Sequence, residues 1–252
     1  DIPYGINYEE WDVLHNNTNS ALLGRSPAQE KCGTVFKTRG KPLNGWSQAA
    51  KAIPMEYYQE TIRRQSVVNE GVRFSLKDQI TANTFDTYEY IYENGITDYV
   101  KEFVGEAETL SDVQFWQTER KGRDRADKPE YKVKINAALC FSNKKQLKEY
   151  YHNSSFLEHG GAPEKAVRSA FVSQIDAYLK ANGKYLKTDS KVNYQDIEDC
   201  LVLVVSSFST QTSYENQTKK AITNKFIQEA MTEFFRHQLE VYFLENPLDG
   251  EK

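Results

Sequence analysis

Three polar residues in a row, Gln217, Thr218 and Lys219, follow an apolar run at 200–208 and precede a long amphipathic stretch. A lysine brings a compact positive charge to a phosphate, and a glutamine amide donates a hydrogen bond to a phosphoryl oxygen. The triplet has two interpretations: a solvated turn before a helix, or a set of phosphate ligands. As an isolated tripeptide it favours the turn, so the rest of the chain must decide.

Other residue types that carry chemistry show no useful spacing. The three cysteines lie far apart and lack a C-x-x-C pattern, which argues against a zinc site or a disulfide framework and fits a reducing cytosol. The four histidines, His15, His152, His159 and His237, have no metal-ligand spacing and no paired carboxylate, and we expect three of the four at the surface. The sequence therefore predicts neither a metal centre nor a Ser-His-Asp arrangement.

Composition limits the classes of protein that remain. The chain has 252 residues, of which 39% are apolar and 27% charged, so it is long enough to bury a core and is globular in type. Its net charge of −4 argues against a wholly basic nucleic-acid binder, so any contact with phosphate must be local. No run approaches the roughly 20 apolar residues that cross a bilayer. The start, Asp1-Ile2-Pro3, has neither an initiator methionine nor a signal-like segment, and we expect a piece of a longer protein.

The first third of the chain is only partly regular. Residues 33–38 read as a short strand, and Pro54 is suited to the first turn of a helix that runs to about Asn69, with Gly71 just past its end. Residues 72–78 alternate like a half-buried strand. The polar segment 83–87 is typical of a linker, and we place a domain boundary near Asn83.

The remaining chain is more periodic. It predicts, in order, a helix that contains Ile96, Tyr99, Val100 and Phe103, strands at 113–118 and 131–142 joined by a charged loop at 119–130, a helix from Pro163 to Asn182 stopped by Gly183, a strand at 200–208, and a helix from about Ala221 to Glu245. One face of the second strand carries Val133, Ile135, Ala137, Leu139 and Phe141. Strands mixed with helices and no internal repeat indicate an α+β fold.

Five segments of this second part resemble one family in order and approximate spacing. They are "NGITDYVKEF", "HGGAPEKAVRSAF", "DCLVLVVSSF", "NQTKKAI" and "VYFLENPLDGEK". They are similar to the B subunit of type IIA DNA topoisomerases, the group of bacterial gyrase B and topoisomerase IV B subunits. The resemblance covers about residues 84–252 and implies the family's transducer domain, which has a ribosomal-protein-like βαβ fold.

Upstream, "CGTVFKT" and "NEGVRFSLKD" resemble the end of the family's GHKL-type ATPase domain, so the resemblance implies a truncated ATPase domain at residues 1–83. The family's leading helix, with its catalytic glutamate and magnesium-binding asparagine, has no counterpart in this chain. Its glycine-rich phosphate loop is missing as well. We therefore expect most of the nucleotide pocket to be absent and the fragment alone to be inactive.

The resemblance also implies roles for particular residues. Gln217, Thr218 and Lys219 match the loop that senses the γ-phosphate of ATP, and Lys219 is the catalytic candidate. Ile2, Pro3 and Thr34 match positions beside the adenine. An ordinary strand threonine and a chain end are the competing interpretations for these three.

Arg168 matches an arginine that lines the cavity through which a DNA duplex passes. A duplex is a dense line of negative charge that attracts a local cation without any reading of sequence. A plain solvated arginine is the alternative interpretation, because Arg168 lies off the apolar stripe of its helix. Lys165 shares the exposed side of Arg168. The family's histidine after the glycine pair is replaced here, since the segment reads "GGAPEK".

The implied whole protein is an ATP-hydrolysing DNA topoisomerase that uses ATP and Mg²⁺ and acts on double-stranded DNA. Its implied partners are the topoisomerase A subunit and a second B subunit, which pairs with the first on ATP binding. It is expected in the cytoplasm, with no membrane contact. Two other classes stay open: a related ATPase of mismatch-repair or chaperone type, and a nucleic-acid-binding or interaction module in which the triplet is inert. The L-E-N-P ending favours the topoisomerase.

Overall fold

The computed structural model describes residues 55–81 and 84–251. The strand predicted at 33–38 lies outside these residues, as do three predicted site residues, Ile2, Pro3 and Thr34. The residues from Glu56 onward form one compact unit, which contains the other predicted elements.

A helix and a hairpin begin the described chain. As the sequence predicts, helix α3 (Met55–Val68) ends shortly before Gly71. Gly71 has a φ of +70°. Strand β1 (Phe74–Gln79) pairs antiparallel with β2 (Phe85–Tyr90). The linker predicted at 83–87 is therefore wrong from Phe85 onward. Most side chains of β2 are exposed, so the strand lacks the apolar alternation that would have revealed it. The boundary predicted near Asn83 falls between these two paired strands.

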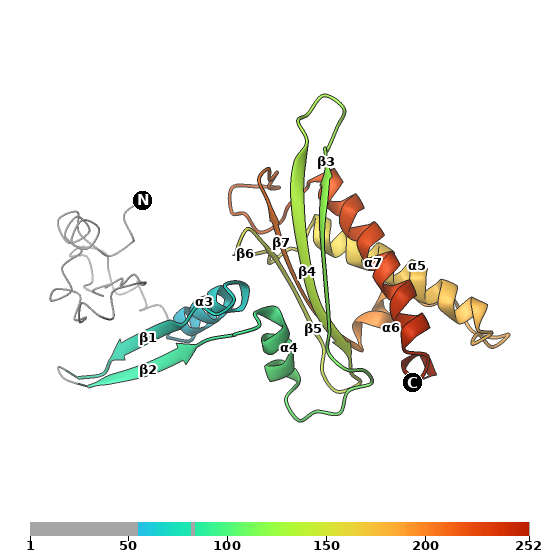
Figure 1. The fold of residues 1–252 in the computed structure, drawn as a ribbon. Coiled ribbons are helices and arrows are strands. Elements are labelled where there is room, and N and C mark those ends of the chain that lie inside the picture. Colours follow the sequence, from blue (N-terminus) through green and yellow to red (C-terminus); the bar gives the residue numbers. More distant parts are fainter. Residues whose placement is uncertain (1–54, 82–83, 252) are drawn as a thin grey trace, which may run out of the picture. The chain divides into compact units, whose positions relative to one another are not determined.

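In the described residues, five strands form the main sheet, in the order β3-β4-β7-β5-β6 (Figure 1). They are β3 (Gln114–Gly122), β4 (Tyr131–Phe141), β5 (Leu147–His152), β6 (Ser155–Phe156) and β7 (Leu201–Ser209). Strand β4 pairs antiparallel with both β3 and β7, whereas β7 and β5 run parallel. Strand β7 is the middle strand, and its first five residues are all buried. Burial on both faces explains its uninterrupted apolar run.

Helices cover the two faces of this sheet. Helices α5 (Ala162–Ala181) and α7 (Lys225–Glu245) pack in one core with the predicted face of β4, including Val133 and Ile135. Helix α4 (Ile96–Val104) packs on the other face with Cys140 and Val204. Short helices α6 (Tyr194–Glu198) and η1 (Asp249–Glu251) complete the described chain. The α+β fold, with both long helices against a sheet that holds both predicted strands, is confirmed.

The last helix begins later than the sequence predicts. Helix α7 starts at Lys225 and not near Ala221, because Ile222 instead forms β-bridges with Tyr214 and Gly161. Helix α5 differs from its prediction by one residue at each end, and Gly183, with φ +62°, follows it as expected.

The charged segment at 119–130 is also more than a solvated loop. Its first four residues belong to β3, and Asp124 in the turn reaches the start of α7. The Asp124 carboxylate accepts hydrogen bonds from Phe226 N, Asn224 Nδ2 and the Tyr131 hydroxyl, each at 2.9 Å. A carboxylate at this end of a helix satisfies free backbone donors and the positive end of the helix dipole. Asp124 thus caps α7 in place of its own N-cap residue, Asn224, whose side chain makes no capping bond.

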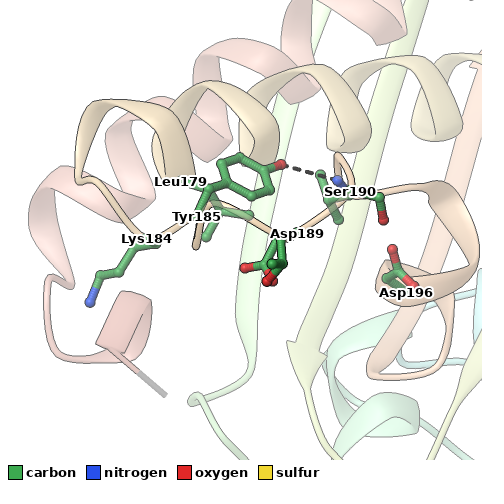
Figure 2. Close-up of a pocket in the computed structure, with 8 residues that line it drawn as sticks. Leu179, Lys184, Tyr185, Asp189, Ser190 and Asp196 are labelled. Carbon is green, nitrogen blue, oxygen red and sulfur yellow. Dashed lines mark hydrogen bonds between the residues drawn. The ribbon is translucent and has the colours of Figure 1, made fainter.

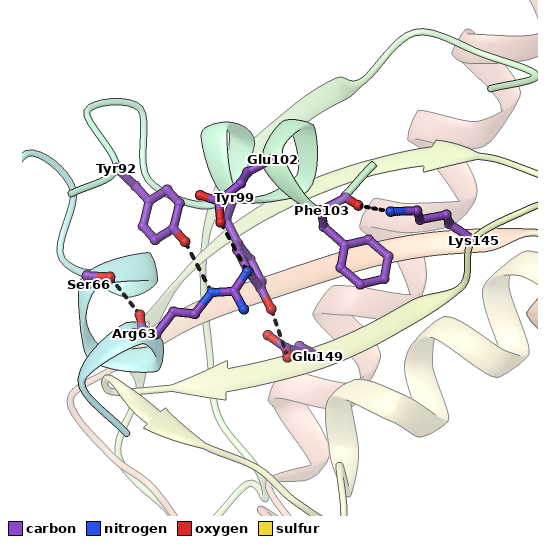
Figure 3. A network of polar contacts seen from close by, with 8 residues as sticks. All are labelled: Arg63, Ser66, Tyr92, Tyr99, Glu102, Phe103, Lys145 and Glu149. Atoms are coloured by element: carbon purple, nitrogen blue, oxygen red, sulfur yellow. Dashed lines mark hydrogen bonds and ion pairs between the residues drawn. The ribbon is translucent and has the colours of Figure 1, made fainter. Parts of the chain in front are cut away.

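A polar network fastens α3 to the sheet face that α4 covers (Figure 3). Arg63 donates to the Tyr92 hydroxyl at 3.3 Å and pairs with Glu102 at 3.2 Å. The Glu149 carboxylate on β5 is buried and accepts hydrogen bonds from Tyr99 at 3.1 Å and Tyr151 at 2.7 Å. Burial and the nearby Glu149 carboxylate raise the pKa of both tyrosines, so they stay protonated donors. Residues on both sides of position 83 therefore belong to one bonded assembly.

Candidate functional site

The triplet Gln217-Thr218-Lys219 lies at the tip of a small hairpin between β7 and α7. Residues 213–223 form this element, hereafter the QTK hairpin. Its two sides are joined by an antiparallel bridge between Tyr214 and Ile222. Backbone hydrogen bonds run from Glu215 N to Ala221 O at 3.0 Å and from Thr223 N to Ser213 O at 2.8 Å. All three triplet residues are exposed, as predicted for a loop that contacts a ligand.

Hydrogen bonds within the tip fix its conformation. The Asn216 carboxamide oxygen accepts hydrogen bonds from the Thr218 backbone at 3.1 Å and from the Thr218 hydroxyl, and Lys219 N donates to Asn216 O at 3.2 Å. Lys219 adopts a positive φ of 57°. Its amine lies 5.7 Å from the centre of the Tyr214 ring and has no ion-pair partner among the described residues. The Thr218 hydroxyl is thus used within the tip, whereas the Lys219 charge is available to a ligand.

The glycine pair Gly160-Gly161 fixes the other side of this hairpin. Gly161 forms a parallel bridge with Ile222, and Ala162 N donates to Ile222 O at 2.8 Å. Gly161 has φ +83°, and a Cβ on it would overlap Ile222 O and lie 2.9 Å from Ile222 N. His159 N donates to Lys220 O at 2.9 Å, which extends the contact. The pair is glycine because the backbone of the QTK hairpin passes directly against it.

The two predicted DNA contacts lie on the helix that this glycine pair opens. Lys165 and Arg168 are on the exposed side of α5. The Arg168 guanidinium lies 3.5 Å from Glu164 and 4.5 Å from the centre of the Tyr194 ring. The structure therefore does not gather them with the triplet in one pocket. It links the two groups through the bonds between Ile222 and the first turn of α5.

Sequence reasoning missed one histidine in the core. His152, at the end of β5, is fully buried, and its ring contacts three hydroxyls, those of Ser207, Ser209 and Thr212. Burial lowers the pKa of the imidazole from 6.5 to about 4. No local signal marks this residue, because its partners follow it in the sequence by 55 to 60 positions.

The buried histidine predicts a pH dependence of stability. The unfolded chain takes up a proton at His152 below about pH 6.5, whereas the folded chain does so only near pH 4. The folded state therefore loses stability as the pH falls from 6.5 to 4, by about 3 kcal/mol, and loses no more below that. Urea unfolding from pH 7 to 4 should show a smaller loss in His152→Gln than in wild type. The exposed His237→Gln should follow wild type, and equal slopes in all three chains would contradict the prediction.

A hollow of about 470 Å³ lies beside the loop after α5 (Figure 2), and none of the triplet residues lines it. It is lined by Leu179, Lys184, Tyr185, Thr188, Asp189, Ser190, Val192 and Asp196. Its carboxylates already serve the backbone: Asp189 accepts from Leu186 N and Asp196 from Asn193 N, each at 2.8 Å. The Tyr185 hydroxyl accepts from Val192 N at 3.0 Å. These bonds order the loop after α5, so we assign no ligand to the hollow.

Neither a metal cluster nor a membrane-spanning helix is present in the described part of the chain. In residues 55–81 and 84–251, no group of three or more His, Cys, Asp or Glu side chains is placed to hold a metal ion. Among the same residues, none of the helices has the length and apolar character needed to cross a membrane.

Comparison with known proteins gives two kinds of relatives. The chain is 26% identical over 200 residues to the DNA gyrase B protein of Mycoplasmoides gallisepticum, which covers 77% of this chain and 30% of that protein. It is 43% identical over 120 residues to the type II methyltransferase M.HindIII of Haemophilus influenzae, which covers 48% of this chain and 36% of the methyltransferase. The chain thus spans about a third of the length of these curated relatives.

Solved structures agree on the fold. The 43K ATPase domain of Thermus thermophilus gyrase B, crystallised with an aminocoumarin, matches with a TM-score of 0.56 at 15% identity. The match covers 81% of this chain and 52% of that one. The family described as DNA gyrase B matches residues 95–252, well over half of the chain, and this range includes the QTK hairpin, Gly161 and α5. The chain belongs to the DNA gyrase B family.

Proposed function

We propose that the chain is part of the B subunit of an ATP-dependent type IIA DNA topoisomerase, and that Gln217 and Lys219 contact the γ-phosphate of ATP. The exposed tip of the QTK hairpin carries this proposal. It presents a lysine amine without an ion-pair partner among the described residues, on a stem bonded to the core.

The residues at the tip suit a phosphate and no more of the nucleotide. Lys219 supplies a point charge, and the Gln217 amide supplies a donor. The Thr218 hydroxyl, which is bonded to Asn216, holds the backbone of the tip in place and does not itself contact the phosphate. We propose Ile2, Pro3 and Thr34 as contacts to the adenine. ATP supplies a phosphoryl group whose charge changes on hydrolysis, and Mg²⁺ would be held by residues of the complete B subunit that have no counterpart in this chain.

Loss of the γ-phosphate removes the partner of Lys219, which is an electrostatic switch. The QTK hairpin is bonded to the first turn of α5, and α5 carries Lys165 and Arg168. We propose that this exposed side of α5 faces the transported duplex, where cations attract phosphates without reading sequence. Nucleotide state and DNA contact would then be coupled through one short backbone connection.

In this proposal residues 84–252 are the transducer domain and residues 1–83 a truncated ATPase domain, whose strand β1 and helix α3 are bonded to the transducer domain through β2 and Tyr92. The complete B subunit would pair with a second copy on ATP binding, associate with the topoisomerase A subunit, close around double-stranded DNA and act in the cytoplasm. The fragment alone would be inactive.

The methyltransferase similarity favours a second candidate for part of the chain. Its 43% identity exceeds the 26% of the gyrase relative, and the gyrase family match begins only at residue 95. In this alternative, 120 residues of the chain derive from a methyltransferase, and because only 94 residues precede residue 95, part of that stretch lies within the gyrase family match.

One experiment separates these candidates. The intact protein is combined with the A subunit and a closed circular plasmid, and the linking number is measured with and without ATP. The same protein is assayed for transfer of a labelled methyl group from S-adenosylmethionine to DNA. We expect an ATP-dependent change of linking number and no methyl transfer. A related ATPase would hydrolyse ATP without changing the linking number, an interaction module would do neither, and methyl transfer alone would support the alternative.

A further inference from the structure

The hydroxyls around His152 determine where its proton lies. The Ser207 hydroxyl donates to Tyr151 O at 3.1 Å, so its oxygen is free to accept but its proton is used. The distance from Ser207 Oγ to His152 Nδ1 is 2.8 Å, and with the Ser207 proton directed to Tyr151 O we assign the proton of this bond to Nδ1. Neutral imidazole has one N–H and one acceptor nitrogen. Nε2 is consequently the acceptor.

Only one neighbouring hydroxyl can donate to Nε2. Ser209 Oγ lies 3.1 Å from it, but the Ser209 hydroxyl donates to Gln211 O at 2.7 Å. Thr212 Oγ1 lies 2.9 Å from Nε2 and 3.4 Å from Ser209 Oγ, so the shorter contact, to Nε2, takes the Thr212 proton. The Thr212 oxygen in turn accepts from Asn153 Nδ2 at 3.1 Å. Each proton in the cluster then has one acceptor, which defines a single arrangement.

Thr212 immediately precedes the QTK hairpin. The next residue, Ser213, donates from its backbone to Asn224 Oδ1 at 2.7 Å and accepts from Thr223 N at 2.8 Å. The incoming side of the hairpin is therefore held at two consecutive residues, one fastened to the end of β5 and the other to the start of α7. Asn224 is itself bonded to Asp124 at 2.9 Å.

We propose that the hydrogen bond from Thr212 to His152 is a latch that positions the QTK hairpin, and with it Gln217 and Lys219, for the phosphate. His152 and Thr212 are positioning residues and touch no substrate. The inference rests on the function proposed above. A neutral histidine suits this task because it accepts from the loop with one nitrogen and donates to the sheet with the other. Its low pKa keeps it neutral at physiological pH.

Thr212→Val and Thr212→Ser test the latch as a matched pair. Valine has the shape of threonine without the hydroxyl, and serine keeps the hydroxyl. In the 252-residue chain, we expect Thr212→Val to accelerate amide hydrogen exchange at Glu215 and Thr223 by about tenfold, since it loses one hydrogen bond and leaves a buried acceptor. Thr212→Ser should exchange like wild type. NMR of the imidazole nitrogens should place the His152 proton on Nδ1 in wild type.

The functional half of the test uses the complete B subunit. We expect Thr212→Val to lower kcat for ATP hydrolysis several-fold with little change in KM, and Thr212→Ser to restore it. Unchanged exchange in Thr212→Val, or a proton on Nε2, would overturn the latch. Faster exchange with wild-type kcat would overturn its positioning role. Lys219→Ala separates failure of the proposed function from failure of the latch. If Lys219→Ala hydrolyses ATP at the wild-type rate, the proposed function fails. If Lys219→Ala is slow but Thr212→Val hydrolyses ATP at the wild-type rate, only the latch fails.

Discussion

Replacing Lys219 with alanine in the complete B subunit should lower the rate of ATP hydrolysis by about 100-fold or more, because in the proposed function the lysine stabilises charge that develops on the γ-phosphate in the transition state. Nucleotide binding should stay measurable, since other groups would hold the adenine and the remaining phosphates. DNA strand passage should fall in step with hydrolysis. Steady-state ATPase and plasmid relaxation assays measure both.

The structure offers a sharp control for this variant. Lys219 has a positive φ, which strains the backbone of alanine as much as that of lysine. The substitution therefore removes the charge without changing the conformational strain of the loop. Lys187→Ala removes another exposed lysine, from the loop after α5, and should leave hydrolysis unchanged. If Lys219→Ala also hydrolyses ATP at the wild-type rate, the triplet is a solvated turn and its assignment is wrong.

Gly161→Ala should destabilise the folded chain by about 3 to 5 kcal/mol. A positive φ costs a side chain about 1 to 2 kcal/mol. The new Cβ would also overlap Ile222 O, so the QTK hairpin must move and the bond from Ala162 N to Ile222 O must lengthen or break. Urea unfolding measures the total, and amide exchange at Thr223 reports whether the hairpin has moved.

Gly183→Ala is the matched control. Gly183 also has a positive φ, of 62°, but a Cβ there meets nothing within 4 Å. The control should therefore lose only about 1 to 2 kcal/mol, and exchange at Thr223 should stay at the wild-type rate. Equal losses in the two variants would mean that the contact with Ile222 contributes nothing to stability.

The sequence predicts these core elements well because apolar residues recur in each of them at the spacing typical of a strand or a helix. Strand β4 alternates, strand β7 opens with five consecutive apolar residues, and helices α5 and α7 carry apolar stripes that end at Gly183 and before Pro247. The triplet stands out in the sequence for a related reason: its three polar residues lie between an apolar strand and an amphipathic helix. Its exposure is confirmed, and its role stays a prediction.

What the sequence could not predict depends on pairings between distant segments. Asp124 caps a helix that begins about 100 residues later, and His152 contacts hydroxyls that follow it by 55 to 60 positions. Strand β2 was missed because its side chains are mostly exposed, and the start of α7 was misplaced because Ile222 pairs with Gly161. None of these features leaves a local pattern in the sequence, because each depends on a partner residue that lies nearby only in the folded chain.

The stem of the QTK hairpin also changes the entropy of ligand binding. The cross-bridged residues Tyr214, Glu215, Ala221 and Ile222 are ordered when the chain folds, which leaves only the short tip between them to be immobilised by a phosphate. Fixing one backbone residue opposes binding by about 1–2 kcal/mol, so an unfastened loop of the length of residues 210–224 would lose most of the attraction between Lys219 and a phosphate. Because the tip is short and already bonded through Asn216, that attraction would, in the proposed function, remain available to discriminate a triphosphate from a diphosphate.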